Sequence, residues 1–228
     1  MSFKYETHMH TIEGSACGRS TGKEMVRAYK EAGYTGVFVT DHFFNGNCAV
    51  DRSLSWEEKV EQFCKGYENA KEEGDKIGLD VFFGFEYCVD AADFLVYNLN
   101  KEWLLKYPDI DKWEPRKAFA QIHEDGGFIV HAHPFRERDY INHIHLFPRD
   151  VDGVEILNGG QLEYPLMNER AKIYAMMYDL PVTSGSDSHF AGGLQGCGVE
   201  VAKRIEKPLD YLELLKAGEL VLLGEAKE

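Results

Sequence analysis

Near its start the sequence reads Glu6-Thr7-His8-Met9-His10-Thr11, in which two histidines alternate with other residues at the end of an expected β-strand. Side chains two residues apart in a strand point to the same face, so His8 and His10 are expected to lie together. Two imidazoles placed in this way can bind one metal ion. A single His-x-His is more often a half-buried pair in a strand, so its interpretation depends on the rest of the chain.

Four further segments each place a histidine or a carboxylate just after a short apolar run that is rich in β-forming residues. They are Thr40-Asp41-His42, Gly84-Phe85-Glu86, His131-Ala132-His133-Pro134 and Ser186-Asp187-Ser188-His189. Taken alone, each is a weak signal, and Asp187-Ser188-His189 could be a helix cap or a turn. Because five separate segments deliver metal-binding side chains at the same point of their strands, together they predict a multinuclear metal site.

Short β-branched or aromatic runs alternate with helical stretches along the chain. The expected strands are 37–40, 81–84, 127–130, 153–156 and 181–184, and the expected helices are 22–32, 56–77, 114–124, 165–178 and 208–217. Repeated β-α units favour a parallel barrel or a doubly wound sheet. A barrel gathers the C-terminal ends of all its strands on one face, whereas an open sheet spreads them along one edge. The strand-end clusters therefore favour an α/β barrel with a single active-site face.

The composition predicts one domain that spans residues 1–228. The chain has 228 residues, of which 44% are hydrophobic, and this is enough for one large core. No apolar run is long enough to cross a membrane, and residues 1–6 lack the apolar segment of a signal peptide, so a cytoplasmic protein without a membrane partner is expected. Five cysteines without Cys-x-x-Cys spacing indicate reduced thiols. A net charge of −14 argues against a nucleic-acid polymer as a partner.

The five motifs, taken jointly, resemble those of the PHP (polymerase and histidinol phosphatase) superfamily. The resemblance extends from His8 to His189, which is most of the chain. It implies a distorted, TIM-like barrel of seven β/α units, (β/α)7, that holds two or three divalent ions of zinc, manganese or iron. It also implies a metal-dependent phosphoesterase.

The resemblance implies nine metal ligands in three groups, with Glu86 bridging the first two: His8, His10, Glu86 and Asp187; Glu86, Asp93 and His133; and Glu13, His42 and His189. Glu13 stands where many members of the superfamily have Asp or His. Asp93 stands where many have His. Both residues can bind a metal through oxygen, so these departures bear on the identity of the metal.

Four other residues allow two interpretations each. Arg136, on the loop after His133, either clamps a phosphate or forms a surface salt bridge, and Arg19 allows the same two readings. Cys17 is expected to be a small buried residue rather than a thiolate ligand, because nitrogen and oxygen ligands suit phosphate chemistry. His131, two residues before His133 on a strand, is expected on the same face, as a hydrogen-bonding neighbour or a buried polar residue.

The predicted ligands suggest how a phosphate could bind inside an acidic protein. Three divalent ions carry more positive charge than the four ligand carboxylates carry negative charge, so the site favours a small phosphorylated substrate over a polymer. A water held between two ions would lose its proton and attack phosphorus in line, while the ions and Arg136 neutralise the developing charge. A metal-bound water or His189 would protonate the leaving group.

Other functions are compatible with parts of this pattern. Within the phosphoesterases, a histidinol-phosphate phosphatase is the named alternative. Amidohydrolases that cleave C–N bonds also combine a His-x-His with a late strand-terminal Asp, but His189 after Asp187 and the early pair of Glu13 and His42 favour the PHP arrangement. A metal-binding domain without turnover is the third alternative, and the full set of predicted ligands argues against it.

Overall fold

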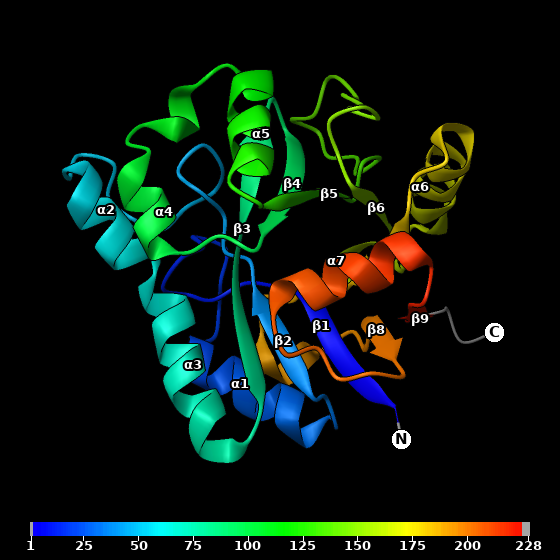
Figure 1. Cartoon of the computed structure of the whole chain (residues 1–228), viewed down its shortest axis with the longest axis horizontal. Helices are drawn as coiled ribbons and strands as arrows, with labels where there is room; N and C mark the ends of the chain where they lie inside the picture. Colours follow the sequence, from blue (N-terminus) through cyan, green and yellow to red (C-terminus); the bar gives the residue numbers. More distant parts are fainter. Residues whose placement is uncertain (1, 225–228) are drawn as a thin grey trace.

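A computed structural model describes residues 2–224, and within them one sheet of nine strands runs in the order β7-β6-β5-β4-β3-β2-β1-β8-β9. The strands are β1 (Phe3–Met9), β2 (Gly36–Val39), β3 (Asp80–Val89), β4 (Ala92–Tyr97), β5 (Phe128–Ala132), β6 (Gly153–Asn158), β7 (Val182–Gly185), β8 (Gly198–Val201) and β9 (Val221–Leu223). The helices are α1 (Gly22–Glu31), α2 (Trp56–Phe63), α3 (Lys65–Ile77), α4 (Lys101–Lys106), α5 (Pro115–Glu124), α6 (Pro165–Tyr178) and α7 (Pro208–Ala217). Helices lie around the outside of the strands (Figure 1).

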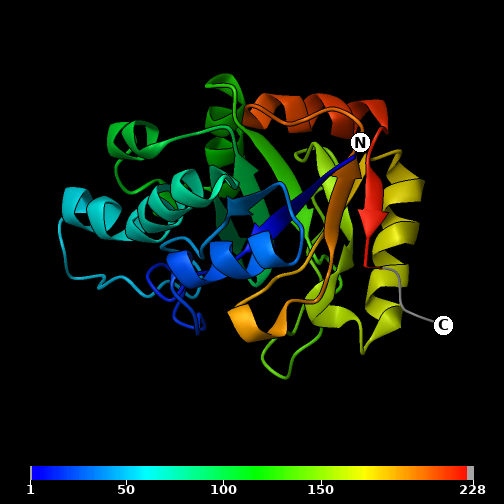
Figure 2. The ribbon, with the colours of Figure 1, turned by 90° about the horizontal axis from the view of Figure 1, so that it is seen from below.

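The sheet curls until its β7 end meets β1, which gives a nearly closed barrel (Figure 2). The hydroxyl of Thr7 on β1 donates to the carbonyl of Ser184 on β7 at 2.7 Å. Just beyond the two strands, the His10 amide donates to the Ser188 carbonyl at 2.9 Å. The predicted α/β barrel is therefore confirmed, and its closure joins the first and the last of the predicted ligand segments.

All five predicted helical stretches form helices, and one of them is divided into two helices. The predicted helix 56–77 is two helices, α2 and α3, which meet at Cys64. Local sequence explains where helices begin: Thr21 and Ser55 precede α1 and α2, and each accepts a hydrogen bond from the backbone amide of a glutamate three residues later. This reciprocal cap satisfies amides that would otherwise lack partners.

The sequence predicted parallel strands and therefore missed the antiparallel hairpin of β3 and β4. β3 pairs parallel with β2 as far as Phe83, then pairs antiparallel with β4. Asp90 and Ala91 join the two strands with φ of 47° and 65°, as a tight two-residue hairpin turn requires. Glu86 consequently lies inside β3, where that strand parts from β2, rather than after the strand.

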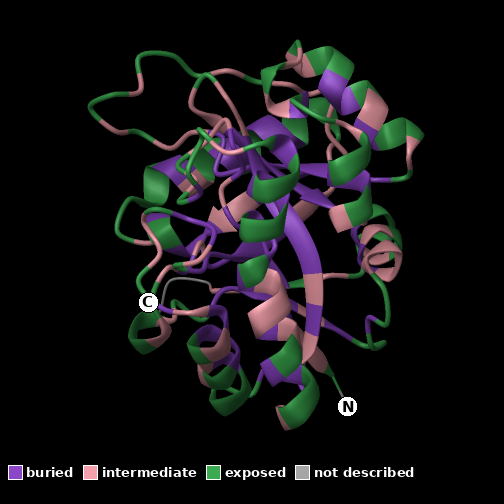
Figure 3. Ribbon diagram, turned by 90° about the vertical axis from the view of Figure 1, so that its left-hand side faces the viewer, coloured by how far each residue is buried: buried purple, intermediate pink, exposed green. Residues whose placement is uncertain are grey.

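Helix α7 fills the barrel at the end opposite the predicted ligands. The Tyr211 ring lies 5.2 to 5.8 Å, centre to centre, from the rings of Phe38, Tyr97 and Phe128. Its hydroxyl is 2.7 Å from that of Thr183. Most of the strand residues are buried, while the outer helix faces are exposed (Figure 3). Among residues 2–224, no helix is both long and apolar enough to cross a membrane.

Candidate metal centre

The carboxylate of Glu86 lies at the centre of a group of imidazoles and is fully buried. Four ring nitrogens lie within 3.5 Å of its oxygens: His8 Nε2 at 3.4 Å and His133 Nε2 at 3.2 Å from Oε1, and His10 Nε2 at 3.5 Å and His42 Nδ1 at 2.5 Å from Oε2. Within the described residues, neither oxygen accepts a hydrogen bond of good geometry. A buried carboxylate without donors, faced by several imidazole nitrogens, fits a ligand that bridges metal ions.

His8, His10 and Asp187 form one compact group of possible ligands. The Nε2 atoms of the two histidines are 3.1 Å apart, and Asp187 Oδ1 lies 3.5 Å from His8 Nε2 and 3.2 Å from His10 Nε2. Zinc–nitrogen bonds of about 2.0–2.1 Å in a tetrahedral arrangement separate two nitrogens by roughly 3.3 Å. The spacing fits a single divalent ion held by these three side chains.

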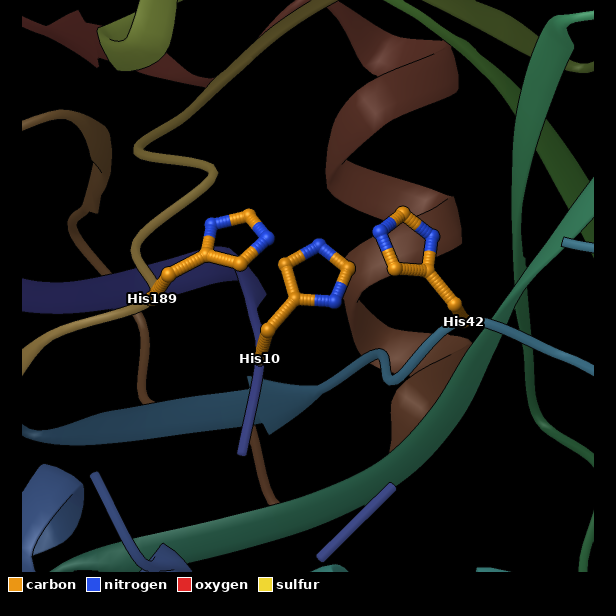
Figure 4. A group of neighbouring side chains, drawn as sticks. All are labelled: His10, His42 and His189. Atoms are coloured by element: carbon orange, nitrogen blue, oxygen red, sulfur yellow. The ribbon is translucent and has the colours of Figure 1, made fainter. Parts of the chain in front are cut away.

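A second side of the cluster brings His10, His42 and His189 together. The His10 ring lies between the other two (Figure 4), with ring centres 4.4 Å from His42 and 4.2 Å from His189. These three residues come from the ends of β1, β2 and β7. A third group unites His8, Glu86 and His133. The structure thus brings seven of the nine predicted ligands into one cluster: His8, His10, His42, Glu86, His133, Asp187 and His189.

Glu13, which the sequence grouped with His42 and His189, makes its hydrogen bonds at helices α1 and α3 instead. Its carboxylate accepts hydrogen bonds from the Gly22 amide at 3.1 Å and from the Asn69 side chain at 3.0 Å. It therefore lies at the N-terminus of α1, where the helix dipole stabilises a negative charge.

Cys17 lies beside His42 and His189, which the sequence did not predict. The residue is half-buried rather than buried, and it lines the same cavity as the two imidazoles. Burial alone would raise the pKa of the Cys17 thiol, but hydrogen bonds with His189 and His42 outweigh burial and lower the pKa to about 6. The only sequence signal was its place seven residues after His10 in the loop that follows the first strand.

Asp93 and Arg136 meet at the rim of the cluster. Asp93 is buried on β4, and its pKa is raised by burial and by the Glu86 charge, while His133 opposes the change. Arg136 Nη1 lies 3.9 Å from Asp93 Oδ2. Both residues line a cavity of about 800 Å³ that also reaches His133 and Asp187. Arg19 is exposed, and its guanidinium stacks over the Phe190 ring at 4.9 Å.

Glu155 on β6 is a buried carboxylate that the sequence analysis did not single out. One of its oxygens lies 3.0 Å from Nδ1 of His8, and the other accepts the backbone amide of His133 at 3.0 Å. The Asn158 side chain also donates to it, at 2.8 Å. A carboxylate behind a metal-binding imidazole fixes the ring and its tautomer. The available signal was an isolated acidic residue inside an apolar strand.

Asp41 supports His10 through a hydroxyl. Ser15 Oγ lies 2.9 Å from His10 Nδ1 and donates to Asp41 Oδ1 at 2.7 Å. Asp41 also accepts from the amide and the hydroxyl of Thr11, at 2.6 and 2.7 Å. This support occupies Nδ1 of His10, so the ring has only Nε2 available for a metal.

The backbone at two predicted ligands lies in the left-handed region. His133 has φ of 28° and Asp187 has φ of 54°. Such φ values are uncommon for residues other than glycine and concentrate at functional sites. The turn at His133 also overturns the expectation that His131 shares its face, because the His131 ring stacks on Phe94 at 4.6 Å, outside the cluster.

Charges in the cluster favour ionised carboxylates. Burial opposes ionisation of Glu86, but His42 and His8 outweigh it and hold the pKa of this carboxyl well below its usual range. Burial also opposes ionisation of Asp187, but His8 and His10 outweigh it and hold the pKa of this carboxyl well below its usual range. Metal ligands must be deprotonated, so both carboxylates have the charge state that binding requires.

Comparisons with known proteins concern one segment of the chain and its fold. Residues 165–220, which contain Asp187 and His189, match a family model described as PHP-associated, PHP_C. A two-domain protein of Bacteroides vulgatus ATCC 8482, described as containing a predicted PHP-like metal-dependent phosphoesterase, has the same fold with a TM-score of 0.68 at 16% identity. The alignment covers 97% of this chain and 64% of that one. The match to a PHP-associated model is therefore confined to residues 165–220, and the likeness to the solved structure shows a shared fold.

Two other solved structures share this fold. PsfC of Pseudomonas syringae PB-5123 has a TM-score of 0.62 at 17% identity, covering 92% of this chain and 88% of its own. A lesion-specific endonuclease of Pyrococcus furiosus has a TM-score of 0.57 at 11% identity, covering 97% of this chain and 58% of its own. At these identities the likeness concerns the fold. No curated protein sequence matches the chain.

Proposed function

We propose that this protein is a PHP-type, metal-dependent phosphoesterase that hydrolyses a small phosphate ester at a centre of two or three divalent ions. Glu86 carries the proposal, because it is a buried carboxylate that accepts no hydrogen bond of good geometry within the described residues and has four imidazole nitrogens within 3.5 Å. Such a carboxylate is costly to bury unless cations compensate it. Zinc, manganese and iron all accept this set of nitrogen and oxygen donors.

The residues divide into neighbouring metal positions. His8, His10 and Asp187 would hold one ion, Glu86 and His133 with Asp93 a second, and His42 and His189 a third. Divalent ions bound there would lower the pKa of a bound water and offset the charge of a phosphate group.

Arg136 is proposed to bind the phosphate. It follows His133 by three residues, and its amide donates to the His133 carbonyl at 2.9 Å, which fixes the loop beside the metal cluster. The guanidinium has five N–H donors, and its one carboxylate contact, with Asp93 at 3.9 Å, leaves donors free for a phosphate. The adjoining cavity of about 800 Å³ suits a small molecule.

His189 is proposed as a metal ligand rather than as the proton donor. Its Nδ1 lies 2.8 Å from the Asp187 carbonyl, which can only accept a hydrogen bond. The proton of a neutral ring is therefore on Nδ1, and the lone pair is on Nε2, as metal binding requires.

The test is a screen for phosphate release by protein loaded with Mn²⁺, Zn²⁺ or Fe²⁺. The substrates are phosphomonoesters and phosphodiesters, with histidinol phosphate, nucleotide phosphates and a single-stranded DNA oligonucleotide among them. Hydrolysis of a small ester is expected, and the Glu86→Gln variant should lack it. Cleavage of DNA alone would contradict the proposed substrate class. Failure of every substrate with fully metal-loaded protein would contradict the activity.

A further inference from the structure

Backbone hydrogen bonds on both sides hold Cys17 in place. The Ala16 amide donates to Asn47 O at 2.9 Å, and the Arg19 amide donates to His189 O at 2.8 Å. Gly18 packs so tightly that an added Cβ would meet the Thr11 carbonyl oxygen at 2.3 Å. The loop is thus tied directly to the segment that carries His189.

The thiol of Cys17 belongs to the wall of the metal cluster. It lines the main cavity together with His42 and His189.

The third metal position lacks a donor if Cys17 is left out. We assign His10 to the first ion instead, because Ser15 occupies its Nδ1 and its Nε2 lies 3.1 Å from His8 and 3.2 Å from Asp187. Glu13 is bound at the start of α1 instead. An ion at the third position would then have three donors: His42, His189 and Glu86, whose Oε2 is 2.5 Å from His42 Nδ1. A fourth donor is what a tetrahedral ion requires.

We propose that the Cys17 thiolate binds a metal ion together with His42 and His189, and that it makes this position selective for zinc over manganese. The proposal rests on the metal centre proposed above and assigns it a ligand of a different kind. Thiolate and imidazole donors select zinc, whereas manganese prefers oxygen donors. The positions around Asp187 and Asp93 contain carboxylates instead, so the cluster would contain one sulfur-ligated ion beside ions held by nitrogen and oxygen.

The test replaces Cys17 and measures metal binding directly. Protein loaded with Co²⁺ should show a near-ultraviolet thiolate-to-cobalt charge-transfer band, and Cys17→Ser should abolish it. Zinc content should fall by about one equivalent per chain in this variant. Cys17→Asp should retain the equivalent but exchange zinc for manganese more readily. Cys48→Ser is the matched control, because Cys48 lies in the bridge opposite Ser15 and should leave the band unchanged.

A second measurement uses the unaltered protein and does not depend on how the variants fold. Zinc should protect Cys17 from alkylation in the wild type, as peptide mapping of the labelled cysteines would show. An unchanged cobalt band in folded Cys17→Ser, or equal labelling of Cys17 with and without zinc, would overturn the proposal. Neither result would contradict the proposed phosphoesterase activity. Conversely, if zinc protects Cys17 but the protein hydrolyses no phosphate ester, only the proposed function would be overturned.

Discussion

The carboxylate of Glu155 lies 3.0 Å from Nδ1 of His8, opposite the ring nitrogen that faces Glu86. Because its second oxygen holds the His133 amide, one buried side chain positions two predicted ligands on different strands. An imidazole backed by a carboxylate is oriented, and it is also a stronger base toward a metal. Glu155 therefore acts on the metal cluster through His8 and His133 without being a ligand itself.

Replacing this carboxylate by an amide should weaken metal binding. Glu155→Gln keeps the shape of the side chain but removes its charge, and loss of such a partner lowers metal affinity by roughly 10- to 100-fold. Competition titrations with a zinc chelator would measure the change. Glu169→Gln, at an exposed position on α6, is the control and should bind zinc like the wild type. Equal affinity in both variants would assign Glu155 a purely structural role.

Removal of the metals should destabilise the fold as well as stop hydrolysis. The predicted ligands lie on β1, β3 and β4 and on the segments that follow β1, β2, β5 and β7, so bound ions would connect distant parts of the barrel. Ligand at a thousand times its dissociation constant stabilises a protein by about 4 kcal/mol, which corresponds to roughly 10 °C in melting temperature for a domain of this size. Differential scanning fluorimetry before and after chelation would show the shift. A melting temperature that stays constant after verified metal removal would contradict a structural contribution of the ions.

Local patterns predict the ligand segments because strand periodicity places His8 and His10 on one face, and barrel closure then gathers the strand ends. Such inference requires only short-range sequence and one rule of topology. It succeeds for His42, Glu86 and Asp187, which all reach the cluster.

The failures lie where long-range contacts determine the backbone. The loop that contains Glu13 and Cys17 has no periodicity, and its path depends on hydrogen bonds to Asn47 and to His189. The turn at His133 is likewise held by Glu155, a residue 22 positions away. A strand pattern continued through His133 therefore places His131 on the wrong face.

The role of Asp93 can be tested by its removal. If Asp93 is a ligand beside Glu86 and His133, Asp93→Ala should lose about one metal equivalent and orders of magnitude in turnover, as expected when a catalytic ion is removed. Elemental analysis of the purified variant would measure the metal. Unchanged metal content would assign Asp93 instead to its contact with Arg136, and the second position would then depend on Glu86 and His133.

His133 and Arg136 are close in sequence but have different proposed tasks, so their variants should differ. His133→Ala should lower metal content, melting temperature and rate together, because His133 Nε2 lies 3.2 Å from Glu86 within the cluster. Arg136→Ala should leave metal content and melting temperature nearly unchanged while it lowers kcat/KM for phosphate esters. The loss should be roughly 2 to 4 kcal/mol of transition-state stabilisation, the scale of one electrostatic contact. Inorganic phosphate should also inhibit the wild type more strongly than Arg136→Ala. Full activity and full phosphate sensitivity in Arg136→Ala would exclude this loop as the phosphate clamp, and Arg19, which stacks on Phe190, would be the next residue to replace.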